Sequence, residues 1–410
     1  MKIFENEHAM QQWLSEQFAM GNSLADFVAN FDDFEQPFSN KQSFSLRKVI
    51  DSFRFCLSSF DNNEVIVENR DISLNDQDIL KPDFLVYAPS TQSVIIIELK
   101  NIKGPTRQVG TEIGAYAAEV KTHLPFLADG DVINVVIASH WPALLRHYVF
   151  NDIVWMGRKL ICLQPVNTQE GIRLEIIPPS LIADTSPEIK FNAQELGGYH
   201  LCLYDDRLYG GSDYYGMEDN ENQMRCALAA MAAKGNSLKT HGFAFLWRHA
   251  FKVGLAPYVI TLVNLSAFQK LPRLLLNPEI VLNDITKRLL RILMDHDPEG
   301  HGHLLDSICD AGIRFLEGFS KPSPENYTDW NVLKPRIFEN TDAIAFVGWG
   351  IFEELFFERL HREYQDGEFD YSHDDPLVAI AMLNEIIGEE RLYVDWEKLG
   401  FNQEDDDGAF

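Results

Sequence analysis

The chain has few cysteines and no long apolar run. Its 410 residues include five cysteines, most of them in apolar sequence: Cys56, Cys162, Cys202, Cys226 and Cys309. An odd number of scattered cysteines predicts reduced, buried thiols rather than a disulfide framework. No stretch reaches the roughly 18 apolar residues that a membrane-spanning helix requires, and Met1–Glu7 lacks the basic start and apolar core of a signal peptide. We therefore expect a cytoplasmic protein that has no membrane partner.

Basic residues are also scarce. The chain carries 35 Lys and Arg against 62 Asp and Glu, a net charge of −27, and such a surface repels the phosphates of nucleic acid. Residues 1–165 hold 14 basic and 21 acidic residues (−7), whereas residues 166–410 hold 21 and 41 (−20). Because the charge is concentrated in the second half, that half is expected to cover a nucleic-acid channel or to bind a basic protein partner.

The length of the chain suggests two domains. The segment 165–187 contains the pair Pro178-Pro179 among Ser, Asp and Thr residues, a composition typical of a domain boundary. We predict a first domain over residues 1–175 and a second, mixed α+β domain over residues 187–410, with a sensing, regulatory or assembly role.

A predicted β-hairpin brings ionisable residues together. Apolar runs at about 82–87 and 93–99 flank the turn signal Ala88–Ser93. Side chains alternate along a strand, so Glu98 and Lys100 share one face, and Asp83 can approach Glu98 from the neighbouring strand. Two carboxylates and a main-chain carbonyl form an oxygen site suited to Mg²⁺ or Mn²⁺, beside which a lysine can orient a metal-bound water.

Pro82-Asp83, fourteen further residues, and then Glu98-Leu99-Lys100 behind the apolar run 94–97 resemble the signature of the PD-(D/E)XK nuclease superfamily. The resemblance covers roughly residues 1–165 and implies an α/β fold with a restriction-endonuclease-like αβββαβ core. It implies that Asp83 and Glu98 hold the metal, that the Leu99 carbonyl adds a ligand and that Lys100 positions the attacking water. Products with 5′-phosphate ends are then expected.

The superfamily often supplies an outer metal contact from an acid on its first helix. Glu7, on a predicted helix over 5–18, resembles that residue, although an acid in a first turn also complements the helix dipole. Asp51, on a predicted helix over 43–60, and Glu68, in a predicted strand over 64–68, are the alternatives.

The helix predicted at 106–123 carries Gln108, Glu112 and Tyr116, four residues apart and therefore on one face. Superfamily members often place on this helix a Gln that contacts the lysine, the water or the phosphate, and Gln108 fits that role. Tyr116 is more typical of a core aromatic residue. A strand over 131–139 completes the expected core.

The second half resembles no family. Its periodicity predicts helices at 220–234, where Gly235 ends the helix, and at 282–294, 343–364 and 376–389, with strands at 199–204, 243–247 and 258–263. We expect the glycine- and tyrosine-rich segment 210–216 to be a packed loop. The segment 295–303 contains zinc-binding residue types in His296, His301 and His303, but its composition favours a solvated turn.

Together these observations predict a metal-dependent endonuclease that uses Mg²⁺ or Mn²⁺ and favours DNA. A nuclease module joined to an acidic second domain is similar to the layout of bacterial anti-phage effectors, which implies antiviral defence and a homo-oligomer or a basic partner. The alternative is a non-catalytic binding or assembly module with the same fold. A zinc hydrolase built on the three histidines is a third hypothesis.

Overall fold

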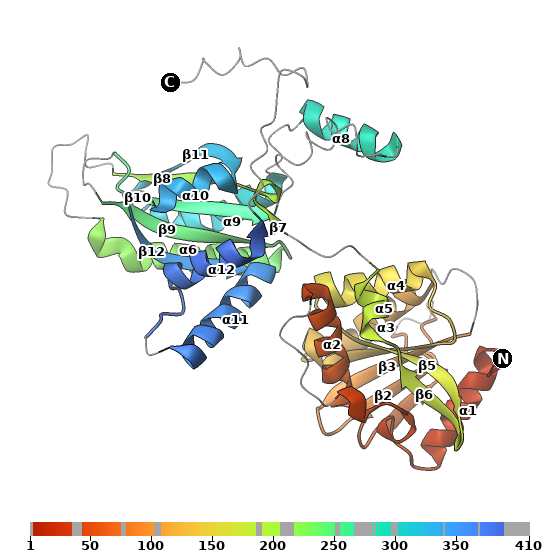
Figure 1. Cartoon of the computed structure of the whole chain (residues 1–410). Coiled ribbons are helices and arrows are strands. Elements are labelled where there is room, and N and C mark those ends of the chain that lie inside the picture. Colours follow the sequence, from red (N-terminus) through yellow and green to blue (C-terminus); the bar gives the residue numbers. More distant parts are fainter. Residues whose placement is uncertain are drawn as a thin grey trace. The chain divides into compact units, whose positions relative to one another are not determined.

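The computed structural model describes residues 3–34, 43–74, 79–101, 108–185, 191–205, 217–250, 255–265, 282, 284–296, 302–338, 341–367 and 370–388. The chain divides into two compact units, Met1–Ile189 and Lys190–Phe410, and each unit combines a β-sheet with helices (Figure 1). No helix in these ranges is both long enough and apolar enough to cross a membrane.

The first unit contains a six-stranded mixed sheet in the order β1-β2-β3-β4-β5-β6. Its strands are β1 (Glu64–Glu68), β2 (Phe84–Ala88), β3 (Ser93–Lys100), β4 (Val132–Ala138), β5 (Lys159–Thr168) and β6 (Gly171–Ile176). Its α-helices are α1 (Glu7–Ala19), α2 (Phe44–Leu57), α3 (Gln108–His123), α4 (Ala143–Phe150) and α5 (Pro179–Ala183). The central strands β3, β4 and β5 are parallel neighbours, and the other pairs are antiparallel.

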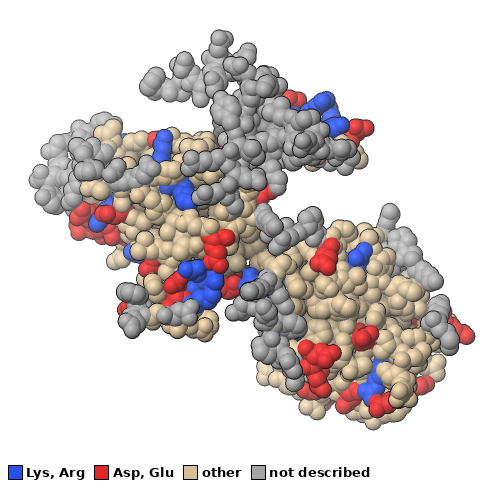
Figure 2. Space-filling view, in the orientation of Figure 1, with Lys and Arg blue, Asp and Glu red and all other residues tan. Residues whose placement is uncertain are grey.

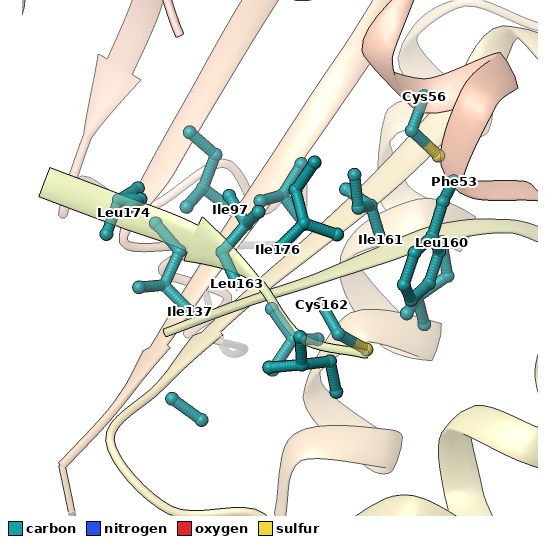
Figure 3. Packing of buried hydrophobic residues seen from close by; sticks show 14 of the residues in the cluster. Phe53, Cys56, Ile97, Ile137, Leu160, Ile161, Cys162, Leu163, Leu174 and Ile176 are labelled. Atoms are coloured by element: carbon teal, nitrogen blue, oxygen red, sulfur yellow. The ribbon is translucent and has the colours of Figure 1, made fainter. Parts of the chain in front are cut away.

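The two faces of β3 belong to different parts of the core. Ile95 and Ile97 point into a large cluster with residues of α1 and α2, and Figure 3 shows how Phe53 of α2 lies against β5. Ile96 points the other way, into a smaller cluster with Tyr116 of α3. Burial on both faces is what the continuous apolar run at 94–97 predicts for a central strand.

The second unit contains a five-stranded antiparallel sheet in the order β11-β8-β10-β9-β12. Its strands are β8 (Leu196–Tyr204), β9 (Gly242–His249), β10 (Tyr258–Leu265), β11 (Lys321–Asp329) and β12 (Thr341–Trp349), and the two-residue strands β7 (Phe191–Asn192) and β13 (Ile387–Gly388) pair separately. The α-helices are α6 (Glu221–Ser237), α8 (Asp284–His296), α9 (Gly302–Leu316), α10 (Trp330–Phe338), α11 (Ile351–Asp366) and α12 (Pro376–Ile386).

Aromatic rings fill one face of the second sheet. Phe243 and Phe245 of β9 contact Trp330 of α10, and Phe243 also contacts Phe352 of α11. Helices α6 and α9 contribute to the core on the other face. Strand β11 contains two prolines, Pro322 and Pro324, which lack amide protons and are tolerated because this strand is at the sheet edge.

Two helix predictions in the second half are wrong. Residues 343–364 are not one helix, because β12 occupies 341–349 and α11 follows after a sharp turn at Gly350, whose φ is +60°. Gly235 does not end α6, which continues to Ser237. A Cβ at Gly235 would lie 2.4 Å from the Trp349 ring, so glycine is needed there for close packing rather than for termination.

The prediction of buried thiols is confirmed for three of the five cysteines. All five cysteines are free, and Cys56, Cys162 and Cys309 are buried, but Cys202 is half-buried and Cys226 is exposed. The predicted loop 210–216 and the histidine His301 lie outside the described residues.

Candidate functional site

The hairpin of β2 and β3 places Asp83 and Glu98 at the same end of the sheet. Phe84 pairs with Ile97 in the antiparallel register, so the preceding residue Asp83 lies beside Glu98. The Oδ2 atom of Asp83 accepts a hydrogen bond from the Leu99 amide at 2.7 Å. Leu99 thus joins the cluster through its N–H, while its side chain is buried on the opposite face of β3.

Glu98 and Lys100 lie on one face of β3 and form a partly buried ion pair. The distance from Lys100 Nζ to Glu98 Oε1 is 2.5 Å. Glu98 is 3% exposed, and its other oxygen, Oε2, is buried without a hydrogen-bond partner in the described part of the chain. A buried carboxylate oxygen without a partner is costly to maintain, which marks this atom as available to a bound cation or donor.

Helix α3 contributes a second partner for the lysine. Glu112 Oε2 lies 3.2 Å from Lys100 Nζ, and the Tyr116 hydroxyl donates to the Lys81 carbonyl at 3.0 Å. Gln108 is the first residue of α3, and its side chain lies outside the described residues. Of the three residues predicted on one face of this helix, Glu112 is the one for which the structure describes a contact with Lys100.

Helix α1 reaches the same end of the sheet through Glu7. Its Oε1 accepts a hydrogen bond from the Asn101 amide at 3.2 Å, and the Asn101 side chain donates to the Phe4 carbonyl at 3.0 Å. The Asn101 Oδ1 atom is buried and has no partner among the described residues. The sequence analysis did not identify Asn101 as a residue of the site. Its position directly after Lys100 in the sequence is the feature that could have indicated it.

The two alternative acids are positioned differently. Asp51 is exposed on α2, a helix that packs mainly against β5. Glu68 accepts hydrogen bonds from Ser15 at 2.8 Å and Gln11 at 3.3 Å, both on α1. Of the three candidate acids, only Glu7 contacts the segment that carries Lys100.

The electrostatics of the site follow from burial and crowding. Burial, reinforced by repulsion from Asp83, raises the pKa of Glu98 to about 8. Burial also raises the pKa of Asp83 to about 6, although the Leu99 amide and Lys100 act in the opposite direction. Burial lowers the pKa of Lys100, but Glu98, Glu112 and Glu7 outweigh it and hold that pKa above its ordinary value.

A single ammonium group therefore interacts with four carboxylates, those of Glu7, Asp83, Glu98 and Glu112. Among the described residues, no three side chains of His, Cys, Asp or Glu converge in a way that could hold a metal ion. Mg²⁺ nevertheless binds through one or two carboxylates and retains several waters. The all-oxygen donors, the excess negative charge and the unpartnered Glu98 oxygen fit such a hard cation.

We compared the chain with protein-family models, curated proteins and solved structures, and none of the three comparisons found a match.

Among the described residues, the face of the molecule drawn in Figure 2 has no large cluster of basic side chains. On the face shown in Figure 2, Lys and Arg side chains form separate spots rather than one continuous basic surface. Affinity for nucleic acid through non-specific phosphate contacts requires several such side chains together.

Proposed function

We propose that the first unit is a metal-dependent nuclease that hydrolyses phosphodiester bonds, with DNA as the favoured substrate. The observation that supports it is the buried carboxylate of Glu98, which has one oxygen on Lys100 and the other without a partner, beside Asp83. Asp83 and Glu98 would hold Mg²⁺ or Mn²⁺, and Glu7 would act from outside through the Asn101 amide. The element order α2-β1-β2-β3-α3-β4 supports the further proposal of a restriction-endonuclease-like core.

When bound, the metal would lower the pKa of a coordinated water and offset charge on the phosphate. The protein's own contribution is to hold the ammonium of Lys100 between Glu98 and Glu112. Held there, Lys100 can donate a hydrogen bond to the attacking water or to a phosphate oxygen. Asp83 is fixed by the Leu99 amide, so its carboxylate needs little reorganisation before the reaction.

Incubation with supercoiled plasmid and Mg²⁺ or Mn²⁺ tests the proposal. Nicking should depend on the metal, stop with EDTA and fall at least about 100-fold in Glu98→Ala/Lys100→Ala, because the positioned charge is lost. The matched control is Lys121→Ala/Asp129→Ala, which removes an exposed ion pair of the same unit and should leave the rate unchanged.

The plasmid assay and the metal content of the purified protein distinguish the nuclease from a non-catalytic module and from a zinc hydrolase. A non-catalytic module would bind nucleic acid, but even the wild-type protein would give no metal-dependent product. Stoichiometric zinc in the purified protein would instead support the zinc hydrolase hypothesis. A role in antiviral defence, in which the acidic second unit senses or restrains the nuclease, is a further proposal that depends on the nuclease activity.

A further inference from the structure

A pocket of about 450 Å³ lies in the first unit, and none of its lining residues belongs to the carboxylate cluster. Its apolar wall comes from β1, β2 and β3 at one edge of the sheet, from the second half of α3 and from the residue after this helix. The wall includes Val67, Leu85, Val94, Val120 and Leu124. A volume of this order is typical of sites for small organic ligands.

The mouth of the pocket exposes apolar surface. A β-bulge between Val65 and Val67 leaves Ile66 outside the ladder, and this side chain lines the pocket while 52% exposed. Bulges re-aim side chains at sheet edges. An open apolar pocket in so acidic a chain is evidence for a binding site, because exposed apolar patches on soluble proteins are commonly functional.

The polar groups of the pocket differ in what they can offer a ligand. Asp71 already accepts hydrogen bonds from the amides of Ser73 and Leu80, and the His123 ring is within 2.7 Å of the Ile72 carbonyl.

Arg70 lines the same pocket and is exposed, and it has no hydrogen bond or ion pair within the described residues. A guanidinium group at the rim of an apolar pocket favours an acidic group on the ligand.

We propose that this pocket binds a small amphipathic anion, with an aromatic or aliphatic body against the apolar wall and an acidic group at Arg70. The proposal stands independently of the nuclease activity, because it concerns a different set of residues and is tested by binding alone.

The test is a fluorescence titration of the full chain with 1-anilinonaphthalene-8-sulfonate, an aromatic sulfonate. One probe should bind per chain, Arg70→Ala should weaken binding at least fivefold, and Val67→Trp should abolish it by filling the pocket. Val67 is half-buried on an edge strand, where an aromatic residue is tolerated. Circular dichroism verifies folding, and Ile66→Trp, at a still more exposed position, serves as a second filling variant.

Competition distinguishes the chemistry of the ligand. Decanoate should displace the probe at least tenfold more effectively than decanol, which has the same body without the charge. Equal displacement by both compounds would overturn anion recognition. Unchanged probe binding in a folded filling variant would overturn the site itself, as would loss of binding in Ile285→Ser/Leu289→Ser, which removes exposed apolar side chains from α8.

Discussion

Glu98 and Asp83 lie close enough to Lys100 to be stabilised by it and close enough to each other to compete for it. Burial adds to their mutual repulsion, so the two carboxyl groups resist being ionised together. In the protein without metal, burial and the repulsion from Asp83 raise the pKa of Glu98 to about 8, although Lys100 acts in the opposite direction. The Glu98 carboxyl group therefore binds a proton more readily than an exposed glutamate does.

The free energy of unfolding should consequently fall as the pH rises. The pKa of Glu98 is about 8 in the folded protein against an ordinary 4.5, so the folded state binds a proton that the unfolded state releases. This contribution is complete below pH 4.5 and is lost as the pH rises through about 8. Glu98→Gln, which cannot ionise, should flatten the dependence between pH 5.5 and 8.5 by about 1–3 kcal/mol.

Urea unfolding in EDTA at several pH values measures this difference. Glu170→Gln is the control, because its carboxylate is exposed and paired with Arg173. Parallel curves for the wild type and Glu98→Gln would show that Glu98 is ionised in the folded protein throughout this range.

Metal binding should release a proton for the same reason. A carboxylate must be ionised to ligate Mn²⁺ or Mg²⁺, so an ion that binds Glu98 displaces the proton that the raised pKa of this group favours. Calorimetric titrations in buffers of different ionisation enthalpy should give close to one proton released per ion, with an affinity that increases with pH. Asp83→Asn should bind the ion at least tenfold more weakly, and affinity independent of pH would contradict this role for Glu98.

The parts of the site that could be predicted are those fixed by one hairpin. Strand alternation is sufficient to place Lys100 beside Glu98, and the turn position brings Asp83 close to them. Glu112 and Asn101 contact the cluster through the packing of α3 and α1 onto the sheet. Helical periodicity reports which face a residue occupies but not which strand that face covers.

Helix α3 contacts both the carboxylate cluster and the apolar core of the first unit. Its residues reach Lys100 through Glu112 and the smaller apolar cluster through Val120. We expect Glu112→Gln to lower the pKa of Lys100, because one of the charges that raise it is removed, and to slow nicking about tenfold. NMR titration of Lys100 and the plasmid assay measure the two effects.

Glu119→Gln is the matched control, since it neutralises an acid on the same helix that accepts a hydrogen bond from the Leu74 amide instead. If both variants changed the pKa of Lys100 equally, the cause would be the total charge of the helix and not the contact between Glu112 and Lys100.

Helix α6 was expected to stop at Gly235, and the reason it continues is tertiary packing. Gly235→Ala should destabilise the protein by about 1–3 kcal/mol, because its Cβ would overlap the Trp349 ring. The same change at Gly114, in α3, meets nothing within 4 Å and should be neutral or stabilise by up to about 1 kcal/mol. Chemical unfolding of both variants provides the comparison, and equal stabilities would exclude the packing explanation.

The strand β12 and the helix α11 were predicted as one helix, because the sequence does not mark the boundary between them. Residues 341–349 are rich in small and apolar residues and continue into an amphipathic helix, so periodicity alone merges the two elements. The positive φ of Gly350 separates them. Glycine suits this position for a second reason, because a Cβ there would lie 2.2 Å from the His241 ring and 2.5 Å from the Thr240 carbonyl oxygen. Central strands such as β3 and β4 were predictable because burial on both faces leaves an uninterrupted apolar run.

Each of the two units has its own sheet and its own core. All pairings of β1 to β6 and the two apolar clusters around them lie within residues 3–183. The fragment 1–189 should therefore unfold cooperatively on its own, which urea unfolding followed by circular dichroism can measure. Failure of this fragment to fold would mean that its core depends on residues beyond 189.

Removal of the second unit also changes the charge that nucleic acid meets. Residues 1–189 carry 15 basic and 25 acidic residues (−10), whereas residues 190–410 carry 20 and 37 (−17). If the second unit restrains the nuclease by repelling phosphates, the fragment should nick plasmid several-fold faster than the full chain, and most clearly at low salt, where charge repulsion has the longest range. Adding residues 190–410 as a separate chain distinguishes a restraint that needs covalent linkage from one that acts by binding. An unchanged rate at every salt concentration would remove charge repulsion as the role of the second unit while leaving the chemistry assigned to Asp83, Glu98 and Lys100 intact.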